Sequence, residues 1–196
     1  MVKAIIFDCF GVLILTEGGL NKMLVELEPS RPEKVREIVN IIDDSSKGSL
    51  DPQKARKSVA KLLGLNDKEY SQMIKNSERK NTELLSLIAN LKTTYKIGLL
   101  SNILKDGIKN RFSDEELRNH FDAVVASGEI GYAKPDAQSY EITASKLGVR
   151  LDECIMVDDR EDYCEGAERV GMRAILYKNF EQLKADLGTV LANSDN

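Results

Sequence analysis

Five short apolar runs, separated by longer segments with helical periodicity, constrain the fold of this chain more than any other feature. Each run holds four to six residues, and apolar side chains fall on both of its faces, as in the strands of a covered parallel sheet. Helical segments precede the second, fourth and fifth runs. This alternation predicts an α/β fold with a doubly wound parallel sheet. The runs are AIIF (4–7), KIGLLS (96–101), DAVVAS (122–127), CIMV (154–157) and RAILY (173–177).

About eighty residues without a convincing strand separate the first two runs, and they are predicted to form an inserted bundle of helices. Apolar residues recur there at spacings of three and four, as at Leu20, Leu24 and Leu27. The insert would lie as a small helical cap over the carboxyl edge of the sheet. The expected helices cover residues 19–28, 32–43, 52–63 and 67–78. The expected domains are a core of residues 1–15 and 80–196 and a cap of residues 16–79.

Composition and charge exclude several classes of protein. A net charge of -4 and a pI near 5.3 argue against nucleic acid or an anionic membrane as a partner. The apolar run after Met1 is too short for a signal peptide or a membrane-spanning helix. Cys9, Cys154 and Cys164 lack metal-ligand spacing, and their odd number argues against a disulfide framework, so we expect a cytoplasmic protein. No surface pattern predicts a stable assembly, and we expect a monomer or a weak homodimer.

Reactive side chains follow the first, second and fourth runs, and one lysine follows the third. Taken singly, each has an ordinary structural explanation, because aspartates and serines are common at turns and acids are common at helix starts. In an open α/β sheet, however, ligands bind at the carboxyl ends of the strands. The joint pattern therefore predicts one site. Its residues are Asp8, Ser101, Asn102, Lys134, Asp158 and Asp159.

This set of groups suits phosphoryl transfer. An ionised Asp8 carboxylate can act as a nucleophile and form an acyl phosphate. Asp8 and Asp159 offer the hard oxygen ligands that Mg²⁺ prefers. Lys134 and Ser101 can hold the remaining oxygens of the phosphoryl group, and Asp158 can orient Lys134.

Four segments of the chain also resemble the signature motifs of a known family. FDCFGVL, LLSN, GEIGYAKPD and MVDDRED are similar, in order and spacing, to the motifs of the haloacid dehalogenase-like (HAD-like) hydrolases. The resemblance runs from residue 4 to about residue 177, with the helical insert at the place of that family's smaller, helical cap. It implies a Rossmannoid core and Mg²⁺-dependent phosphatase activity, here on a small phosphorylated metabolite.

The resemblance also implies a role for each matched residue. Asp8 would be the nucleophile, and Asp8, Asp159 and the backbone carbonyl of Phe10 would bind the metal. That backbone contact survives any side chain at position 10. The remaining implied roles are phosphate binding for Ser101 with Asn102, and stabilisation of the nucleophile and the phosphate for Lys134.

Phe10 is a departure from the family pattern. Typical phosphatases of the family carry an aspartate at this place, which gives a proton to the leaving group and later takes one from water. Phenylalanine can do neither, and general acid–base catalysis is typically worth ~10²–10⁴ in rate. Turnover should therefore be slowed, least of all for acyl or aryl phosphates. Glu17 is a candidate replacement, although a solvated loop acid is the simpler interpretation.

Three functions stay open at this point. The first is a slowed phosphatase. The second is a metal-independent 2-haloacid dehalogenase, because those enzymes carry an aromatic residue where Phe10 stands. Their fourth motif, however, lacks the adjacent acids Asp158 and Asp159, which would repel a carboxylate substrate unless a cation neutralised them. The third is an inactive domain that binds a phosphorylated ligand or a protein. The preserved Asp8, Lys134 and Asp159 argue against it, because a site without turnover has no chemical need for all of them. We therefore favour the phosphatase.

Overall fold

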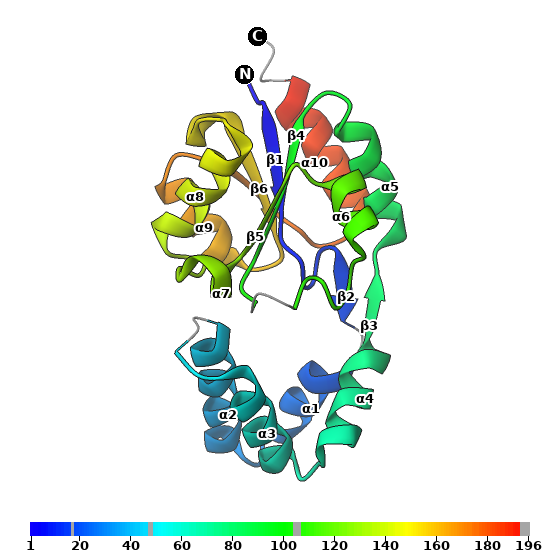
Figure 1. The fold of residues 1–196 in the computed structure, drawn as a ribbon, viewed down its shortest axis with the longest axis vertical. Helices are drawn as coiled ribbons and strands as arrows, with labels where there is room; N and C mark the ends of the chain where they lie inside the picture. The colour runs from blue at the N-terminus through cyan, green and yellow to red at the C-terminus, as the bar shows by residue number, and fades with distance from the viewer. Residues whose placement is uncertain (17, 47–48, 104–106, 193–196) are drawn as a thin grey trace.

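The core of the fold is a parallel sheet (Figure 1). A computed structural model describes residues 1–16, 18–46, 49–103 and 107–192, and within these ranges the sheet has five strands. They are β1 (Ala4–Phe7), β4 (Lys96–Ser101), β5 (Ala123–Ala126), β6 (Cys154–Asp158) and β7 (Arg173–Leu176). Every strand begins and ends within one residue of a predicted apolar run.

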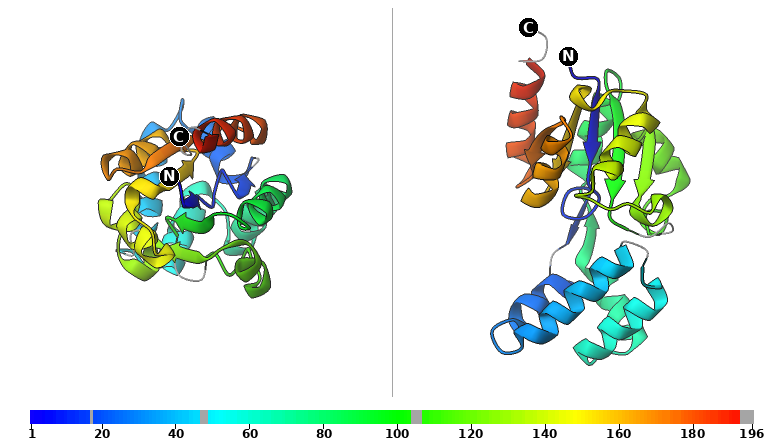
Figure 2. Two further views of the ribbon diagram at one scale, coloured as in Figure 1. Left: turned by 90° about the horizontal axis from the view of Figure 1, so that it is seen from above. Right: turned by 90° about the vertical axis from the view of Figure 1, so that its left-hand side faces the viewer.

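Helices cover both faces of this sheet (Figure 1 and Figure 2). They are α5 (Thr82–Leu91), α6 (Asp114–His120), α7 (Ser127–Ile130), α8 (Ala137–Leu147), α9 (Glu161–Arg169) and α10 (Phe180–Ala192). Side chains alternate along β1, so that Ile5 and Phe7 pack toward α5 and α10, whereas Ala4 and Ile6 pack toward α8 and α9. The predicted doubly wound α/β fold is confirmed.

The strand order brings three strand ends together at one edge. The order is β5-β4-β1-β6-β7. β1 is therefore the central strand, with β4 and β5 on one side of it and β6 and β7 on the other. In this register Phe7 lies beside Leu99 of β4 and beside Val157 of β6. The residues that follow these positions therefore meet at the carboxyl edge, where such sheets bind ligands.

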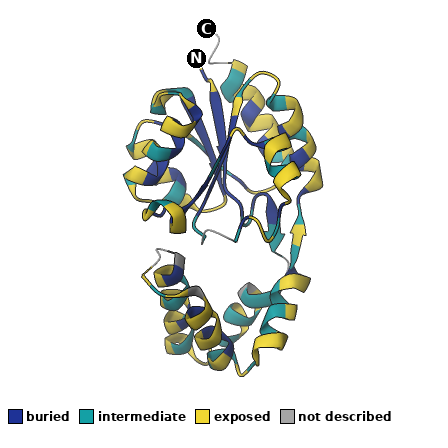
Figure 3. Ribbon diagram, in the orientation of Figure 1, coloured by how far each residue is buried: buried dark blue, intermediate teal, exposed yellow. Residues whose placement is uncertain are grey.

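The described part of the insert forms a bundle of four helices at this edge (Figure 1). They are α1 (Gly19–Leu27), α2 (Pro32–Ser46), α3 (Pro52–Leu63) and α4 (Asp67–Ser77), and each begins at the predicted residue. Local signals explain the boundaries of α3, because the Asp51 carboxylate accepts a hydrogen bond from the Lys54 N–H (2.9 Å) and Gly64 ends the helix with a φ of 75°. The bundle is mostly exposed or half-buried, and its small core includes Ile38 and Val59 (Figure 3). No helix within the described ranges is long and apolar enough to cross a membrane.

Two short strands join the bundle to the sheet, and the prediction that this region lacks strands was wrong. β2 (Ile14–Thr16) and β3 (Glu78–Lys80) pair antiparallel, with Leu15 opposite Arg79. Three-residue strands are too short to show an alternating pattern, and their partners are far apart in the sequence. The bundle is thus connected to the core through a two-stranded ribbon.

Asn81 fastens the segment that follows Asp8 to the rest of the core. It is the N-cap of α5 and is 4% exposed. Its Nδ2 donates to the Val12 carbonyl oxygen (3.0 Å) and to the Tyr177 Oη (2.9 Å), and its Oδ1 accepts from the Leu84 N–H (3.3 Å). One buried amide therefore connects three separate segments.

Replacement of Asn81 by alanine should lower the free energy of unfolding by about 2–4 kcal/mol, because the cap is lost and buried polar groups are left without partners. Urea denaturation followed by circular dichroism measures this change. Asn66, the exposed N-cap of α4, provides the matched control, since its replacement removes the cap alone and should cost about 1 kcal/mol. Equal losses for the two variants would contradict the connecting role of Asn81.

Candidate active site

A buried lysine lies between two carboxylates at the ends of β1 and β6. The Lys134 Nζ is 2.5 Å from the Asp8 Oδ1 and 2.5 Å from the Asp158 Oδ2. Lys134 is 1% exposed, Asp158 is fully buried and Asp8 is nearly so. The Asp8 N–H donates to the Val157 carbonyl oxygen (2.9 Å), which extends the β1–β6 ladder by one residue. The structure therefore brings three of the predicted site residues into direct contact.

Burial and charge act against each other on the pKa values of this group. Burial raises the pKa of Asp8, and the adjacent Lys134 ammonium opposes that rise. Burial by itself would lower the pKa of Lys134, but the carboxylates of Asp8 and Asp158 raise it above its ordinary value. Lys134 is therefore a permanent cation at neutral pH. The pKa of Asp159 is also raised, first by burial and then by the neighbouring Asp158.

Three carboxylates at this edge lie close enough to hold one cation. One oxygen atom each of Asp8, Asp158 and Asp159 falls within 4.8 Å of the others. Gly11 makes room for them, because a Cβ at this position would lie 2.0 Å from the Asp159 Oδ2 and its φ of +84° disfavours a side chain. This donor set of hard oxygen atoms fits Mg²⁺.

Asp158 is the least available of the three carboxylates. Its Oδ2 accepts from the Lys134 ammonium, and its Oδ1 accepts from the Arg160 N–H (3.1 Å). Asp8 and Asp159 are therefore the better candidates for ligands. The predicted orienting role of Asp158 is consistent with its contact to Lys134 and stays a prediction.

Ser101 presents a hydroxyl group that has no partner among the described residues. The side chain is 1% exposed, and among the described residues its Oγ is the one buried side-chain nitrogen or oxygen atom with no hydrogen bond. An unpaired buried hydroxyl is costly, since it has lost its contacts with water. Ser101 lines the same cavity as Asp8 and Asp159, so its hydroxyl is available to an oxygen atom of a ligand.

Asn102 holds the backbone of Lys134. Its Oδ1 accepts from the Lys134 N–H (2.8 Å), and its Nδ2 donates to the Lys134 carbonyl oxygen (2.8 Å). The same Nδ2 also donates to the Tyr163 Oη (3.0 Å). These contacts fix the position from which the lysine side chain extends. Phosphate binding by Asn102 stays a prediction.

Tyr163 belongs to the site but was not predicted. The Lys134 Nζ lies 4.9 Å from the centroid of its ring, and the Arg160 Cζ lies 4.2 Å from it. The electron-rich faces of the ring thus interact with two cations. The available sequence signal was the place of Tyr163 in the first turn of the helix that follows Asp158 and Asp159.

Phe10 lies in the cavity wall, packed against an arginine. The Arg111 Cζ is 4.7 Å from the centroid of the Phe10 ring. The Arg111 Nε and Nη2 donate to the two carboxylate oxygens of Glu78, at 2.9 and 2.6 Å, and Glu78 is the first residue of β3. The ring offers no proton to a ligand. Glu17, the candidate replacement acid, lies outside the described residues.

A cavity of about 1130 Å³ lies between this edge of the sheet and the helical bundle. Core residues form one wall and bundle residues the other, so a ligand here would touch both. The core wall includes Asp8, Phe10, Ser101, Asn102 and Asp159, and the bundle wall includes Leu20, Ile42, Arg56, Tyr70, Ile74 and Lys75. Lys134 and Asp158 are buried behind the core wall.

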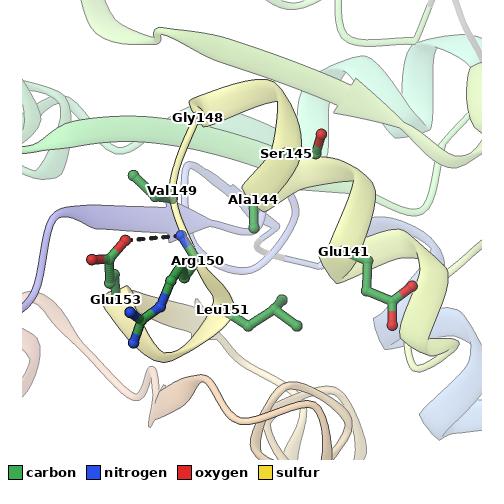
Figure 4. A pocket seen from close by; sticks show the side chains of 8 residues that line it. All are labelled: Glu141, Ala144, Ser145, Gly148, Val149, Arg150, Leu151 and Glu153. Atoms are coloured by element: carbon green, nitrogen blue, oxygen red, sulfur yellow. Dashed lines mark hydrogen bonds between the residues drawn. The ribbon is translucent and has the colours of Figure 1, made fainter.

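A second hollow of about 570 Å³ lies elsewhere, between α8 and the loop that precedes β6 (Figure 4). Its polar groups include Glu141, Ser145 and Arg150, whose N–H donates to the Glu153 carboxylate (2.9 Å). The loop leads into the amino end of β6, opposite the carboxyl edge. None of the predicted site residues lines this hollow.

Comparison with known families agrees with the motifs and the fold. The profile of the haloacid dehalogenase-like hydrolases matches residues 2–171. The chain belongs to the haloacid dehalogenase-like hydrolases. The family resemblance of the four motifs is thereby confirmed, and the matched range contains all the predicted site residues of this HAD-like hydrolase.

Curated relatives of this HAD-like hydrolase include phosphatases. A phosphatase of Mycobacterium tuberculosis is 39% identical over 82 residues, which are 41% of this chain and 38% of that protein. A phosphoserine phosphatase of Thermus thermophilus is 32% identical over 80 residues, which are 40% of this chain and 32% of that protein. The matched segments span about a third of the length of these relatives.

Solved structures of HAD-like proteins share nearly the whole fold. A HAD-like family hydrolase of Porphyromonas gingivalis has a TM-score of 0.75 and 22% identity, and the match covers 97% of this chain and 98% of that one. A HAD family enzyme of Bacteroides thetaiotaomicron, in complex with magnesium and inorganic phosphate, has a TM-score of 0.71 and 22% identity, with 91% and 95% covered.

Proposed function

We propose that this protein is a Mg²⁺-dependent phosphatase that acts on a small phosphorylated metabolite through an aspartyl phosphate on Asp8. The observation that carries the proposal is the buried hydroxyl of Ser101, which no described residue pairs and which lies in a cavity wall shared with Asp8 and Asp159. A hydroxyl donor, a nucleophilic carboxylate and the Lys134 cation are the groups that phosphoryl transfer requires. The phosphatases among the relatives support the proposal.

In the first step, an Asp8 oxygen attacks phosphorus, and the bond between phosphorus and the leaving oxygen breaks as the new bond forms. Lys134 holds the Asp8 carboxylate in place, and its charge offsets the negative charge that collects on the phosphoryl oxygens. The Ser101 hydroxyl donates to one of those oxygens. Since Phe10 has no proton to give, the leaving oxygen takes its proton from water.

In the second step, water attacks the phosphorus of the aspartyl phosphate, the bond to Asp8 breaks and inorganic phosphate leaves. No side chain at position 10 takes the proton of that water, so this step is slowed by a factor of ~10²–10⁴. Asp8, Asp159 and the backbone carbonyl of Phe10 would hold Mg²⁺, which when bound neutralises charge on the transferred group.

Residues 16–79 act in this proposal as a cap that closes over the site. The bundle supplies one wall of the cavity, and it is joined to the core by the β2–β3 ribbon. Gly18 and Gly19, with φ values of 81° and 56°, follow β2 and give the connection the conformational freedom that closure requires. Closure over a bound substrate would keep bulk water away from the transferred phosphoryl group.

A long-lived aspartyl phosphate is the direct test. After the protein is mixed with acetyl phosphate and Mg²⁺, intact-mass measurement should show the addition of one phosphate, and the adduct should persist after the donor is removed. Chelation of Mg²⁺ should prevent its formation, and the Asp8→Asn variant should not form it. Absence of the adduct, together with absence of p-nitrophenyl phosphate hydrolysis, would remove the basis of the proposal.

Phe10 also favours a second candidate, a 2-haloacid dehalogenase, because an aromatic ring stands in the cavity beside Asp8. The neighbouring carboxylates of Asp158 and Asp159 argue against it, since they repel a carboxylate substrate when no cation is bound. Chloride release from 2-chloropropionate in the presence of a chelator would establish this candidate and replace the phosphatase.

A further inference from the structure

Arg111 differs from the other cations that line the cavity. Arg56, Lys75, Arg79 and Arg160 are exposed, and the Lys80 side chain, which forms an ion pair with Glu116, is 34% exposed. The Arg111 side chain is only 21% exposed and lies against Phe10, two residues beyond Asp8. Among the described residues, Arg111 is therefore the least exposed cation that lines the cavity.

The Arg111 guanidinium is held rigidly. Its Nε and Nη2 donate to Glu78, its Nη1 donates to the Gly107 carbonyl oxygen (2.9 Å), and its Cζ lies 4.7 Å from the centroid of the Phe10 ring. Arginine has five N–H donors, and these contacts use three of them. Among the described residues, no contact is found for the second N–H on Nη1 or the second N–H on Nη2, and Arg111 lines the cavity, so these two donors can serve a ligand. A donor fixed in this way loses little conformational entropy when it binds.

The charge around Arg111 selects the kind of anion. Glu78 offsets much of the positive charge of the guanidinium, and its own negative charge repels a dianion more strongly than a monoanion. A carboxylate carries a single charge, and its two oxygens match two adjacent N–H groups. Arg111 therefore fits a carboxylate better than a second phosphate.

We propose that Arg111 binds a carboxylate on the organic part of the substrate, so that the substrates are small phosphorylated carboxylic acids. The inference rests on the proposed function, because it places the phosphate of the same molecule at Asp8 and Ser101. Phe10 then has a positive purpose, since its ring supports the guanidinium that recognises the substrate. Arg111 is in this sense a residue that determines specificity.

Binding separates this inference from the activity. Phosphoglycolate and ethyl phosphate are similar in size, and only the first carries a carboxylate. In the Asp8→Asn variant with Mg²⁺, isothermal titration calorimetry should show that phosphoglycolate binds at least about tenfold more tightly than ethyl phosphate. Further replacement of Arg111 by methionine should bring the two affinities within about threefold, whereas Arg111→Lys, which keeps a cation, should retain part of the preference.

Glu116→Gln is the matched control. It removes the Lys80 ion pair, which also connects β3 to this part of the core, while glutamine preserves the capping box of α6. The preference for phosphoglycolate should survive this change. Equal binding of the two esters without the Arg111 substitution, no binding of either, or a preference that persists in a folded Arg111→Met variant would each overturn the inference. Phosphorylation of Asp8, measured separately by mass, reports on the proposed function alone.

Discussion

Replacement of Phe10 by aspartate is expected to raise the steady-state hydrolysis of p-nitrophenyl phosphate by at least about tenfold, within the ~10²–10⁴ range of general acid–base catalysis. The new carboxyl group can give a proton to the leaving oxygen and take one from the attacking water. The second effect should dominate, because a p-nitrophenolate ion leaves without a proton. The aspartyl phosphate should accordingly disappear faster in Phe10→Asp than in the wild type.

Phe10→Asn is the control for this experiment. Both variants lose the contact between the aromatic ring and Arg111, and both place a polar group of the same shape beside Asp8. Asparagine cannot transfer a proton in the same way, so only aspartate should increase turnover. Asp8→Asn should abolish hydrolysis in every background. An equal gain for aspartate and asparagine would show that the loss of the ring, rather than proton transfer, limits the rate.

Replacement of Lys134 by methionine should lower both the stability and the activity of the protein. Asp8 and Asp158 would remain buried without their cation, and removal of one partner from such a group typically costs about 3–5 kcal/mol. In the folded variant, the rate of Asp8 phosphorylation should fall by a factor of ~10²–10³, because the fixed positive charge beside the transferred phosphoryl group is lost. Urea denaturation and intact-mass kinetics measure the two effects.

Lys96→Met provides the comparison for Lys134. Lys96 also lies near an aspartate, Asp122, at 3.4 Å, but its side chain is 57% exposed. Water solvates both members of such a pair, so its removal should change the free energy of unfolding by less than about 1 kcal/mol. A similarly small change for Lys134→Met would mean that the buried carboxylates are neutral without the lysine and that the proposed electrostatics are wrong.

The site residues could be predicted from the sequence because each follows or ends a strand at the carboxyl edge of the sheet. Asp8, Ser101 and Asp158 each stand at the carboxyl end of an apolar run, and a parallel sheet brings such ends together whatever the details of packing. The starts of the bundle helices were likewise readable from local signals, such as the Asp51 cap of α3.

The remaining features depend on contacts between distant segments. The contact of Arg111 with the Phe10 ring and its ion pair with Glu78 join three parts of the chain, and no local spacing encodes them. The same holds for the amide of Asn102, which contacts Lys134 and Tyr163 instead of closing a local turn. Such partners are fixed by side-chain packing in the folded state, which a single sequence does not display.

The β2–β3 ribbon offers a route by which the helical insert can change in evolution while the core stays the same. Thr16 and Glu78 are directly paired, so the two ends of the helical insert lie next to each other at the ribbon. A tight turn in place of all four helices would reconnect the two strands without altering the path of the sheet. The insert can thus be exchanged as a genetic module, and new selectivity can evolve around an unchanged reaction centre.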